Sequence, residues 1–467
     1  LNPFLENDAA LRELVPLIYS SLLRADPASA ELRPWLAEEW AFSDDGRQVT
    51  FRLPPDRRWS NGNALNASSI SASLQATGHP ALQAFEAITA LNETTLVFEF
   101  EAINCSALTR LSLLPLIPAE EIGLERPSAS GPFVVNDWPE NHRSLSAVRN
   151  PHYPAGSATL GGLNIRFLRE REIEIALSEG RFDLVGPLKA PLNLEVPARF
   201  TDLTYPAGEM VYVAINYEPK NEDPLPQPVH EALIAALDRE TILSQALADD
   251  GQLLAGSLLP QHWGANESLA LPAYDPNAAR ARLIQAGLRD QDGDGWLDQG
   301  SERLELSIRL NGFEPLNQDL GWLISGYYRE LGIFARAEGV GFDSVVDDLF
   351  THDFQLALFS WPMLPDPDQQ LYWRSTENTE GFGLNFTSYQ NGSLDDLFDR
   401  ANTVPGCNPR NRAEVYAEIQ AVLAQDRPVD FLLAPNQHLL VTNRLKAVQP
   451  GPFAPLTWNA EEWEIGN

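Results

Sequence analysis

The chain has 467 residues, of which 44% are hydrophobic and 21% are charged, as in ordinary soluble globular proteins. Its 33 basic and 65 acidic side chains give a formal net charge of -32, which would repel nucleic-acid phosphates and anionic lipid headgroups. The length suggests two or three domains, and no segment approaches the run of about 18 apolar residues that a membrane-spanning helix needs. These properties argue against a nucleic-acid-binding protein, a helical membrane protein and a disordered chain.

Short strands are predicted near the start of the chain, and a helix near its middle. Residues 49–53 follow the turn Asp44-Asp45-Gly46, and residues 96–100 follow Asn92. Apolar residues then recur at the spacing of one helix face after a proline-rich entry, which predicts a helix over 229–237.

Helices and strands continue to alternate in the second half. Asp275-Pro276 has the form of a helix N-cap followed by proline at the first helical position, and Gly287 marks the end of that helix. Residues 304–310 alternate apolar and polar side chains, which predicts a half-buried strand. Residues 415–423 show helical periodicity that ends before Pro428. Strands and helices interleaved along the whole chain favour layered α/β lobes over a bundle or a sandwich.

Common catalytic motifs are missing from the sequence. The pair His230-Glu231 lacks a second histidine at zinc-protease spacing, and there is neither a nucleophile elbow nor a P-loop. Gly339-Val340-Gly341 lacks the third glycine of a dinucleotide loop. We therefore expect no enzymatic activity, although the many acidic residues leave a glycosidase-like carboxylate pair open as an alternative.

An acidic loop at 290–298 is the sharpest local pattern. Asp290, Asp292 and Asp294 alternate with other residues, and Asp298 follows four positions later. Carboxylates so spaced around a glycine resemble the start of a calcium loop, but Ser301 stands where an EF-hand needs its bidentate acid. Two interpretations remain: a calcium site of Asp290, Asp292, Asp294 and Asp298, or a turn with solvated acids.

Aromatic residues gather around position 370. The group comprises Trp361, Tyr372, Trp373, Phe382 and Phe386. Large apolar faces with polar edges suit a solute pocket, and they equally suit a hydrophobic core.

The order of several motifs resembles the family 5 extracellular solute-binding proteins, the dipeptide, oligopeptide and nickel receptors of ABC importers. The resemblance begins with Arg33-Pro34-Trp35-Leu36-Ala37-Glu38-Glu39-Trp40 and continues through Ser43-Asp44-Asp45-Gly46 and Trp59-Ser60-Asn61-Gly62. Later matches are Ser130-Gly131-Pro132-Phe133, Asn150-Pro151-His152-Tyr153, the segment 176–183, Tyr212-Val213-Ala214-Ile215-Asn216, Asp366-Pro367-Asp368 and Arg412-Ala413-Glu414-Val415-Tyr416.

This resemblance implies an α/β periplasmic-binding-protein clamshell of the class II type, with an extra subdomain in lobe one. Lobe one is expected to comprise residues 1–208 plus 436–467, with the subdomain inserted at about 41–130, and lobe two residues 209–435. The implied function is that of an extracytoplasmic receptor that closes on a peptide-like or other small solute and delivers it to the permease subunits of an ABC importer. An oligosaccharide is the alternative solute, and a hydrolase on the same scaffold is a further alternative.

The resemblance also indicates where a solute would bind. Trp361 and Met363 are expected to face the cleft between the lobes, with Tyr212 and Asn216 near the hinge and Tyr372 and Trp373 as further contacts. Peptide receptors of this family hold the peptide ammonium with an Asp three residues before the Asp-Pro pair, and here that position is Met363. A buried ammonium group without a carboxylate partner would be costly, so this mode of peptide recognition is not expected.

Location and cysteine pairing follow from the same resemblance. The family implies a place outside the cytoplasmic membrane, in the periplasm or on the outer cell surface, with a lipid anchor on a removed N-terminal segment as one option. That environment is oxidising, so Cys105 and Cys407 are expected to form one disulfide that ties the lobes together. We expect a monomer, without nucleic acid and without a cofactor apart from the calcium alternative.

Overall fold

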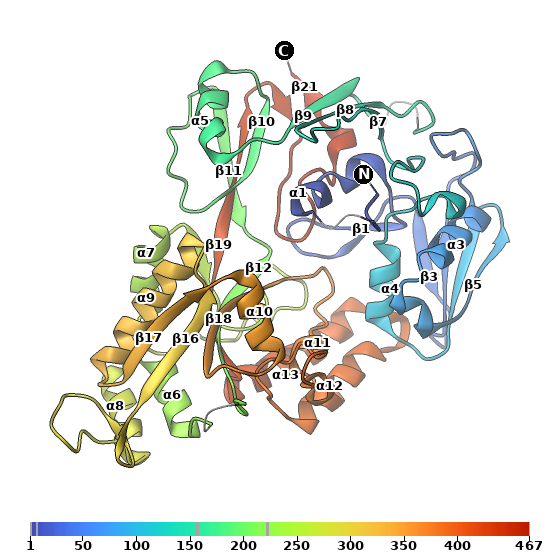
Figure 1. Ribbon diagram of the computed structural model, residues 1–467. Coiled ribbons are helices and arrows are strands. Elements are labelled where there is room, and N and C mark those ends of the chain that lie inside the picture. Colours follow the sequence, from blue (N-terminus) through green and yellow to red (C-terminus); the bar gives the residue numbers. More distant parts are fainter. Residues whose placement is uncertain (1, 6–7, 155–157, 221–223, 467) are drawn as a thin grey trace.

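The computed structural model describes residues 2–5, 8–154, 158–220 and 224–466. These residues form two lobes of mixed strands and helices, as the family resemblance implied (Figure 1). Lobe one and lobe two denote here the ranges expected from the sequence, and both ends of the chain lie in lobe one.

The secondary structure of lobe one includes a series of short strands. They are β1 (Leu23–Ala25), β2 (Leu32–Pro34), β3 (Glu39–Phe42), β4 (Gln48–Arg52), β5 (Phe85–Asn92), β6 (Thr95–Phe100), β7 (Phe133–Asp137), β8 (Ser144–Arg149), β9 (Gly162–Arg166), β10 (Leu184–Lys189), β11 (Phe200–Pro206), β20 (Leu445–Lys446) and β21 (Glu464–Ile465). The helices are α1 (Ala9–Arg12), α2 (Val15–Ile18), α3 (Ala67–Ala76), α4 (Cys105–Ser112) and α5 (Glu170–Glu179), with 3-10 turns η1 (Pro80–Ala84), η2 (Ala119–Glu121) and η5 (Ala460–Glu462).

Lobe two is built from longer elements. Its strands are β12 (Glu209–Ile215), β13 (Gly251–Leu253), β14 (Asp298–Gln299), β15 (Glu302–Arg303), β16 (Glu305–Asn311), β17 (Phe334–Val340) and β18 (Leu356–Pro362), and β19 (Val429–Thr442) is shared with lobe one. Its helices are α6 (Gln227–Ala235), α7 (Arg239–Leu247), α8 (Pro276–Gln285), α9 (Pro315–Glu330), α10 (Phe342–Phe350), α11 (Gln370–Trp373), α12 (Gly392–Asn402) and α13 (Pro409–Asp426), with 3-10 turns η3 (Ser375–Glu377) and η4 (Pro405–Cys407).

The long strand β19 joins the two lobes. Its first half pairs with β12 and β13, and its second half pairs with β10 and β11. Pro435 is paired with β13, whereas Asn436 is paired with β11, so the change of partners falls between these two residues. The chain also passes from β11 of lobe one to β12 of lobe two beside this point. The lobes are therefore connected here by two neighbouring segments, β19 and the link between β11 and β12.

The sheet of lobe two is buried on both faces. Its strands belong to a sheet of order β10-β19-β12-β18-β16-β17, in which β10 lies in lobe one, and β16 runs parallel to both β17 and β18. Along β12, Val211, Val213 and Ile215 pack into the core under α6 to α9, and the alternate residues Met210, Tyr212 and Ala214 pack into the core with α10, α12 and α13. Because successive strand side chains point to opposite faces, one strand supplies both cores.

Lobe one contains a separate sheet of strands β3 to β6. Its strand order is β3-β4-β6-β5, and α3 and α4 pack on it around a core that includes Phe51, Phe98 and Leu108. The second small sheet, β7-β8-β9, packs with the N-terminal segment and the C-terminal tail in another core. Helix α4 contacts α12 of lobe two, so it lies at the edge of lobe one that meets lobe two (Figure 1).

Several local predictions are confirmed. The strands expected at 49–53 and 96–100 are β4 and β6, and β16 alternates buried and more exposed side chains. Asp275 caps α8 by accepting the Ala278 backbone N–H, and α13 ends before Pro428. The helix expected over 229–237 begins and ends two residues earlier, because α6 spans Gln227–Ala235 and Asp238 caps a new helix, α7.

Candidate functional site

A cavity of about 360 Å³ lies among the N-terminal and C-terminal segments of lobe one, and Pro365 of lobe two borders it. Its walls include Glu13, Arg24 and Trp35 from the N-terminal segment, Leu113 just after α4, Phe453 and Trp458 from the C-terminal tail, and Pro365 from lobe two. A volume of this size suits a small molecule. None of these lining residues was among the solute contacts predicted from the sequence.

Arg24 and two tryptophans form one wall of the cavity. The Cζ atom of Arg24 lies 5.8 Å from the ring centroid of Trp35 and 4.9 Å from that of Trp458. Its Nη1 donates to a carboxylate oxygen of Glu461 at 2.6 Å, so the guanidinium charge is already compensated. The indole N–H of Trp35 donates to the Tyr153 hydroxyl, and that of Trp458 to a backbone carbonyl. With their N–H groups satisfied, the two indoles add mainly apolar surface.

Glu13 is the one carboxylate among the described residues that line the cavity. It accepts the backbone N–H of Leu456, and its own carbonyl accepts the Thr457 hydroxyl. Burial raises the pKa of Glu13, and the hydrogen bond from Leu456 opposes this rise. The side chain is therefore held in place by the C-terminal tail, on the wall of the cavity.

Trp361 and Tyr372 belong to a stack of aromatic rings in lobe two. The Trp361 ring centroid lies 4.5 Å from that of Tyr372 and 5.5 Å from that of Phe386, with the planes nearly parallel in both pairs. Both Trp361 and Tyr372 are half-buried. Burial raises the pKa of Tyr372, whereas the charge of Arg110 from α4 of lobe one lowers it. Of the contacts predicted from the sequence, these two keep a surface near the lobe boundary.

The other predicted contacts lie in the core instead. Met363 is only 4% exposed, and its Sδ accepts the backbone N–H of Leu259, so it packs inside lobe two rather than facing a cleft. Tyr212 is buried because it stands on an inward position of β12. Asn216 donates to the carbonyls of residues 352 and 354 and accepts the N–H of residue 218, and Trp373 donates to the Gln369 side chain. The surroundings of these four residues are those of structural side chains.

Asp366 is the centre of a buried polar network that the sequence did not reveal. Both its carboxylate oxygens accept hydrogen bonds from Arg412 at 2.8 Å, and one also accepts the hydroxyl of Thr109 in lobe one at 2.8 Å. Burial by itself would raise the pKa of Asp366, but the Arg412 charge and these hydrogen bonds hold it below its ordinary value. The carboxylate after Met363 is thus committed to Arg412 rather than free for a solute.

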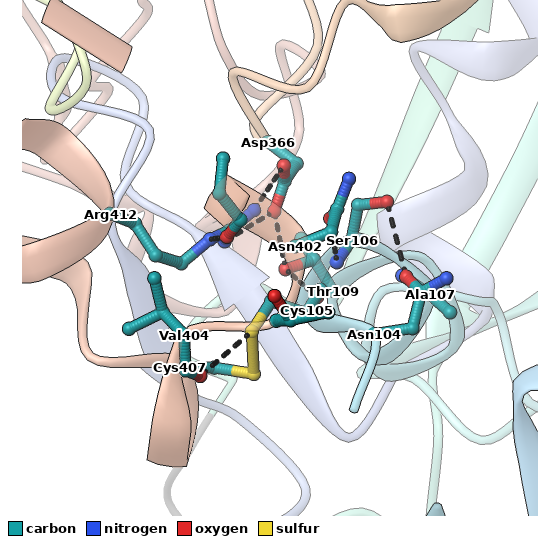
Figure 2. The surroundings of a disulfide bond; sticks show 12 residues. Asn104, Cys105, Ser106, Ala107, Thr109, Asp366, Asn402, Val404, Cys407 and Arg412 are labelled. Atoms are coloured by element: carbon teal, nitrogen blue, oxygen red, sulfur yellow. Dashed lines mark hydrogen bonds and ion pairs between the residues drawn. A yellow bond between two sulfur atoms is a disulfide. The ribbon is translucent and has the colours of Figure 1, made fainter. Parts of the chain in front are cut away.

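The two cysteines are joined in the structure. Cys105, the first residue of α4, and Cys407, in η4, form a disulfide with 5.3 Å between their Cα atoms (Figure 2). Beside it, the backbone N–H of Ser106 donates to the Asn402 side chain. The sequence predicts this pair, and the bond connects lobe one with lobe two.

The acidic loop brings three of its four predicted ligands together. Oxygens of Asp290, Asp292 and Asp294 lie within 4.8 Å of one another on the exposed surface. Asp298 is buried instead, where it accepts the N–H of Gln291, and it does not join that group. Each of the three grouped carboxylates also accepts backbone N–H groups of the loop itself. Calcium binding here stays a prediction from the sequence, and titration calorimetry with calcium chloride would test it.

Comparison with known proteins identifies the family. The family described as "Bacterial extracellular solute-binding proteins, family 5 Middle" matches residues 31–382. The chain belongs to family 5. Among the described residues, no helix is both long and apolar enough to cross a membrane.

Relatives in family 5 differ in what their names say they bind. The chain is 22% identical to the oligopeptide-binding protein AppA of Bacillus subtilis (strain 168), covering 99% of this chain and 89% of that protein. Its fold is similar to that of NikZ from Campylobacter jejuni in complex with Ni(L-His), with a TM-score of 0.80, 21% identity and coverage of 98% of each chain. NikA from Brucella suis in complex with Fe(III)-EDTA gives a TM-score of 0.82 at 17% identity, with 97% and 95% of the two chains covered. These likenesses confirm the two-lobed family 5 fold.

Proposed function

We propose that this chain is the extracytoplasmic receptor of an ABC importer, which binds a small solute between its lobes and delivers it to the permease subunits. Membership of family 5 supports the class of function. The observation that carries the proposal is the aromatic cavity of lobe one that Pro365 of lobe two borders. Closure of lobe two over this cavity would exclude water and strengthen polar contacts inside it. The proposal contains no catalytic step and needs one copy of the chain.

A peptide-like solute is the first candidate, and its contacts would differ from those of the family's peptide receptors. No carboxylate occurs from Trp361 to Pro365, and Asp366 is paired with Arg412. Glu13, on the cavity wall in lobe one, is the carboxylate that a cationic group of the solute could pair with. A charged partner there would also relieve the cost of burying this acid.

An oligosaccharide is the second candidate, and the two tryptophans favour it. Trp35 and Trp458 line the cavity with their N–H groups already satisfied, so their rings offer apolar surface for sugar faces. The charge of Arg24 between them is compensated by Glu461. An uncharged ring would therefore meet no unpaired charge on this wall.

Native mass spectrometry of the purified protein tests the proposal, because a retained solute adds its mass to that of the chain. Thermal unfolding with dipeptides, tripeptides and maltooligosaccharides then separates the two candidates. We expect one class to raise the melting temperature, and we expect Trp458→Ala to remove that rise. Trp322→Ala is the matched control, since Trp322 is 67% exposed on α9. A protein without retained solute that responds to no probe, either oxidised or reduced, would contradict the proposal.

A further inference from the structure

Helix α4 of lobe one is bonded to lobe two by a set of polar contacts away from the crossing strands. The Thr109 hydroxyl donates to Asp366, and the Ser106 N–H donates to the Asn402 side chain. All four residues are buried. In Figure 1 the crossing strand β19 lies near the middle of the molecule, and α4 meets α12 to one side of it.

The disulfide adds a covalent bond at this second place of contact. Cys105 begins α4, and Cys407 lies in the turn η4 between α12 and α13, so the bond ties the same elements as the polar contacts (Figure 2). Two rigid lobes that are joined at one place can rotate about it as a hinge. Joined at a second, separate place, they cannot swing apart without breaking the second connection.

We propose that the Cys105–Cys407 disulfide is a redox-controlled latch that holds the lobes together and must be reduced before they can open fully. Its consequence for solute exchange rests on the proposed receptor function, whereas its effect on lobe motion does not. The chain has two cysteines, and both are used in this bond. Among the described residues, no other disulfide therefore joins the two lobes.

The surroundings of the two sulfur atoms indicate how reduction would proceed. Cys105 is 1% exposed, whereas Cys407 is half-buried in a turn flanked by the exposed residues Pro405 and Asn408. Cys407 is therefore the more exposed residue of the pair and the expected point of attack by a thiolate from solution. Attack on the Cys407 sulfur would release Cys105 as the leaving thiolate at the first turn of α4, where the helix dipole favours negative charge.

The full reaction needs a dithiol as the reductant. The first thiolate forms a mixed disulfide with Cys407 as the bond to Cys105 breaks. The second thiolate of the reagent then attacks its own sulfur in that mixed disulfide and releases the Cys407 thiolate. Two electrons and two protons pass to the protein, which ends with two thiols, and the dithiol ends as a cyclic disulfide.

The polar contacts around the latch allow the lobes to separate once the bond is reduced. Asp366 keeps its two hydrogen bonds from Arg412, which belongs to the same lobe, when the Thr109 hydroxyl leaves. Separation therefore strands no unpaired buried charge in lobe two. The same contacts can form again, so the reduced protein could reclose without the disulfide.

Small-angle scattering of the solute-free protein tests the latch. We expect a larger radius of gyration after reduction with dithiothreitol in native buffer, and in the C105A/C407A variant without reductant, than in the oxidised protein. Thr109→Val is the matched control: it removes an interlobe hydrogen bond but keeps the disulfide, so its radius should stay that of the oxidised protein. Chemical reduction of the unmodified chain keeps the test valid if the double variant does not fold.

Alkylation followed by intact mass measurement checks the chemistry in the same samples. We expect no label on the oxidised protein and two labels after treatment with the dithiol under native conditions. An unchanged radius of gyration in a protein shown to carry two labels would overturn the latch. Labels that appear only in denaturant would overturn its control by reductants. Neither result depends on a solute, so a failed latch is distinguishable from a failed receptor.

Discussion

His438 on the crossing strand β19 places its Nε2 atom 2.6 Å from a carboxylate oxygen of Asp250 in lobe two. Its other ring nitrogen, Nδ1, lies 2.8 Å from a carboxylate oxygen of Asp202 on β11 of lobe one. A protonated imidazolium can donate to both acids at once, so this ring bridges the lobes at the hinge.

The bridge predicts a pH-dependent stability. Burial opposes protonation of His438, but the hydrogen bonds and charges of Asp250 and Asp202 raise its pKa above the ordinary value. A raised pKa in the folded state contributes stability that is complete below the unfolded pKa of about 6.5 and is lost as the pH rises through the folded value. Urea unfolding should therefore show His438→Gln less stable than the unmodified protein at pH 5.5, with a difference that shrinks at higher pH. His152→Gln, at an exposed position, is the control.

The ion pair of Asp366 and Arg412 predicts a large loss of stability when one partner is removed. Asp366→Asn leaves the guanidinium of Arg412, which is 3% exposed, without its counter-charge. Breaking such a buried pair costs about 3–5 kcal/mol. Glu39→Gln breaks the surface pair with Arg52 and should cost less than about 1 kcal/mol. Equal losses in denaturant titrations of the two variants would mean that the buried pair is well solvated.

The disulfide predicts a stability change that depends on redox state. The two cysteines are 302 residues apart, and for a loop of that length the chain-entropy model gives a stabilisation of roughly 5 kcal/mol, with smaller values often measured. Both dithiothreitol and the C105A/C407A substitution should lower the urea midpoint. Reductant should change the midpoint of the double variant no further, and a further decrease there would point to an effect outside this bond.

Gly46 of lobe one lies close to the turn that holds Cys407, so a substitution there tests how closely the two lobes pack. Its φ is +70°, and a Cβ atom there would lie 2.8 Å from the backbone nitrogen of Gly406 in lobe two. Gly78 has a similar φ of +61° with nothing within 4 Å of its Cβ position. Gly78→Ala should cost roughly 1–2 kcal/mol for the left-handed backbone alone. Gly46→Ala should cost more, because the lobes must also shift apart, and calorimetric unfolding of the two variants measures the difference.

Local patterns allowed much of the fold to be predicted. The alternation of residues 304–310 and the cap at Asp275 determine β16 and α8, because strand faces and helix ends depend on neighbours within a few residues. The order of family motifs along the chain indicated the two-lobed architecture. The division into lobes at 435/436 stays a prediction, and β19 changes partners between Pro435 and Asn436.

The candidate site could be predicted only in part, because its walls come from distant parts of the chain. Trp361 and Tyr372 belong to one short aromatic segment, and the sequence pointed to both. Arg24 and Trp458 are adjacent in space but far apart along the chain, and no local pattern connects them. A signal for this region existed in Trp35, which stands in the first family motif.

The sequence by itself therefore determined which residues form strands and helices and which family they build. Only the tertiary structure decided which of these side chains are buried and which partners they contact. Met363 and Trp361 are two positions apart, yet Met363 is buried in the core of lobe two and Trp361 is only half-buried, since burial depends on what packs against each face. Likewise, Asp366 became a structural acid because Arg412 and Thr109 converge on it from two lobes, a contact that forms only when the whole chain is folded.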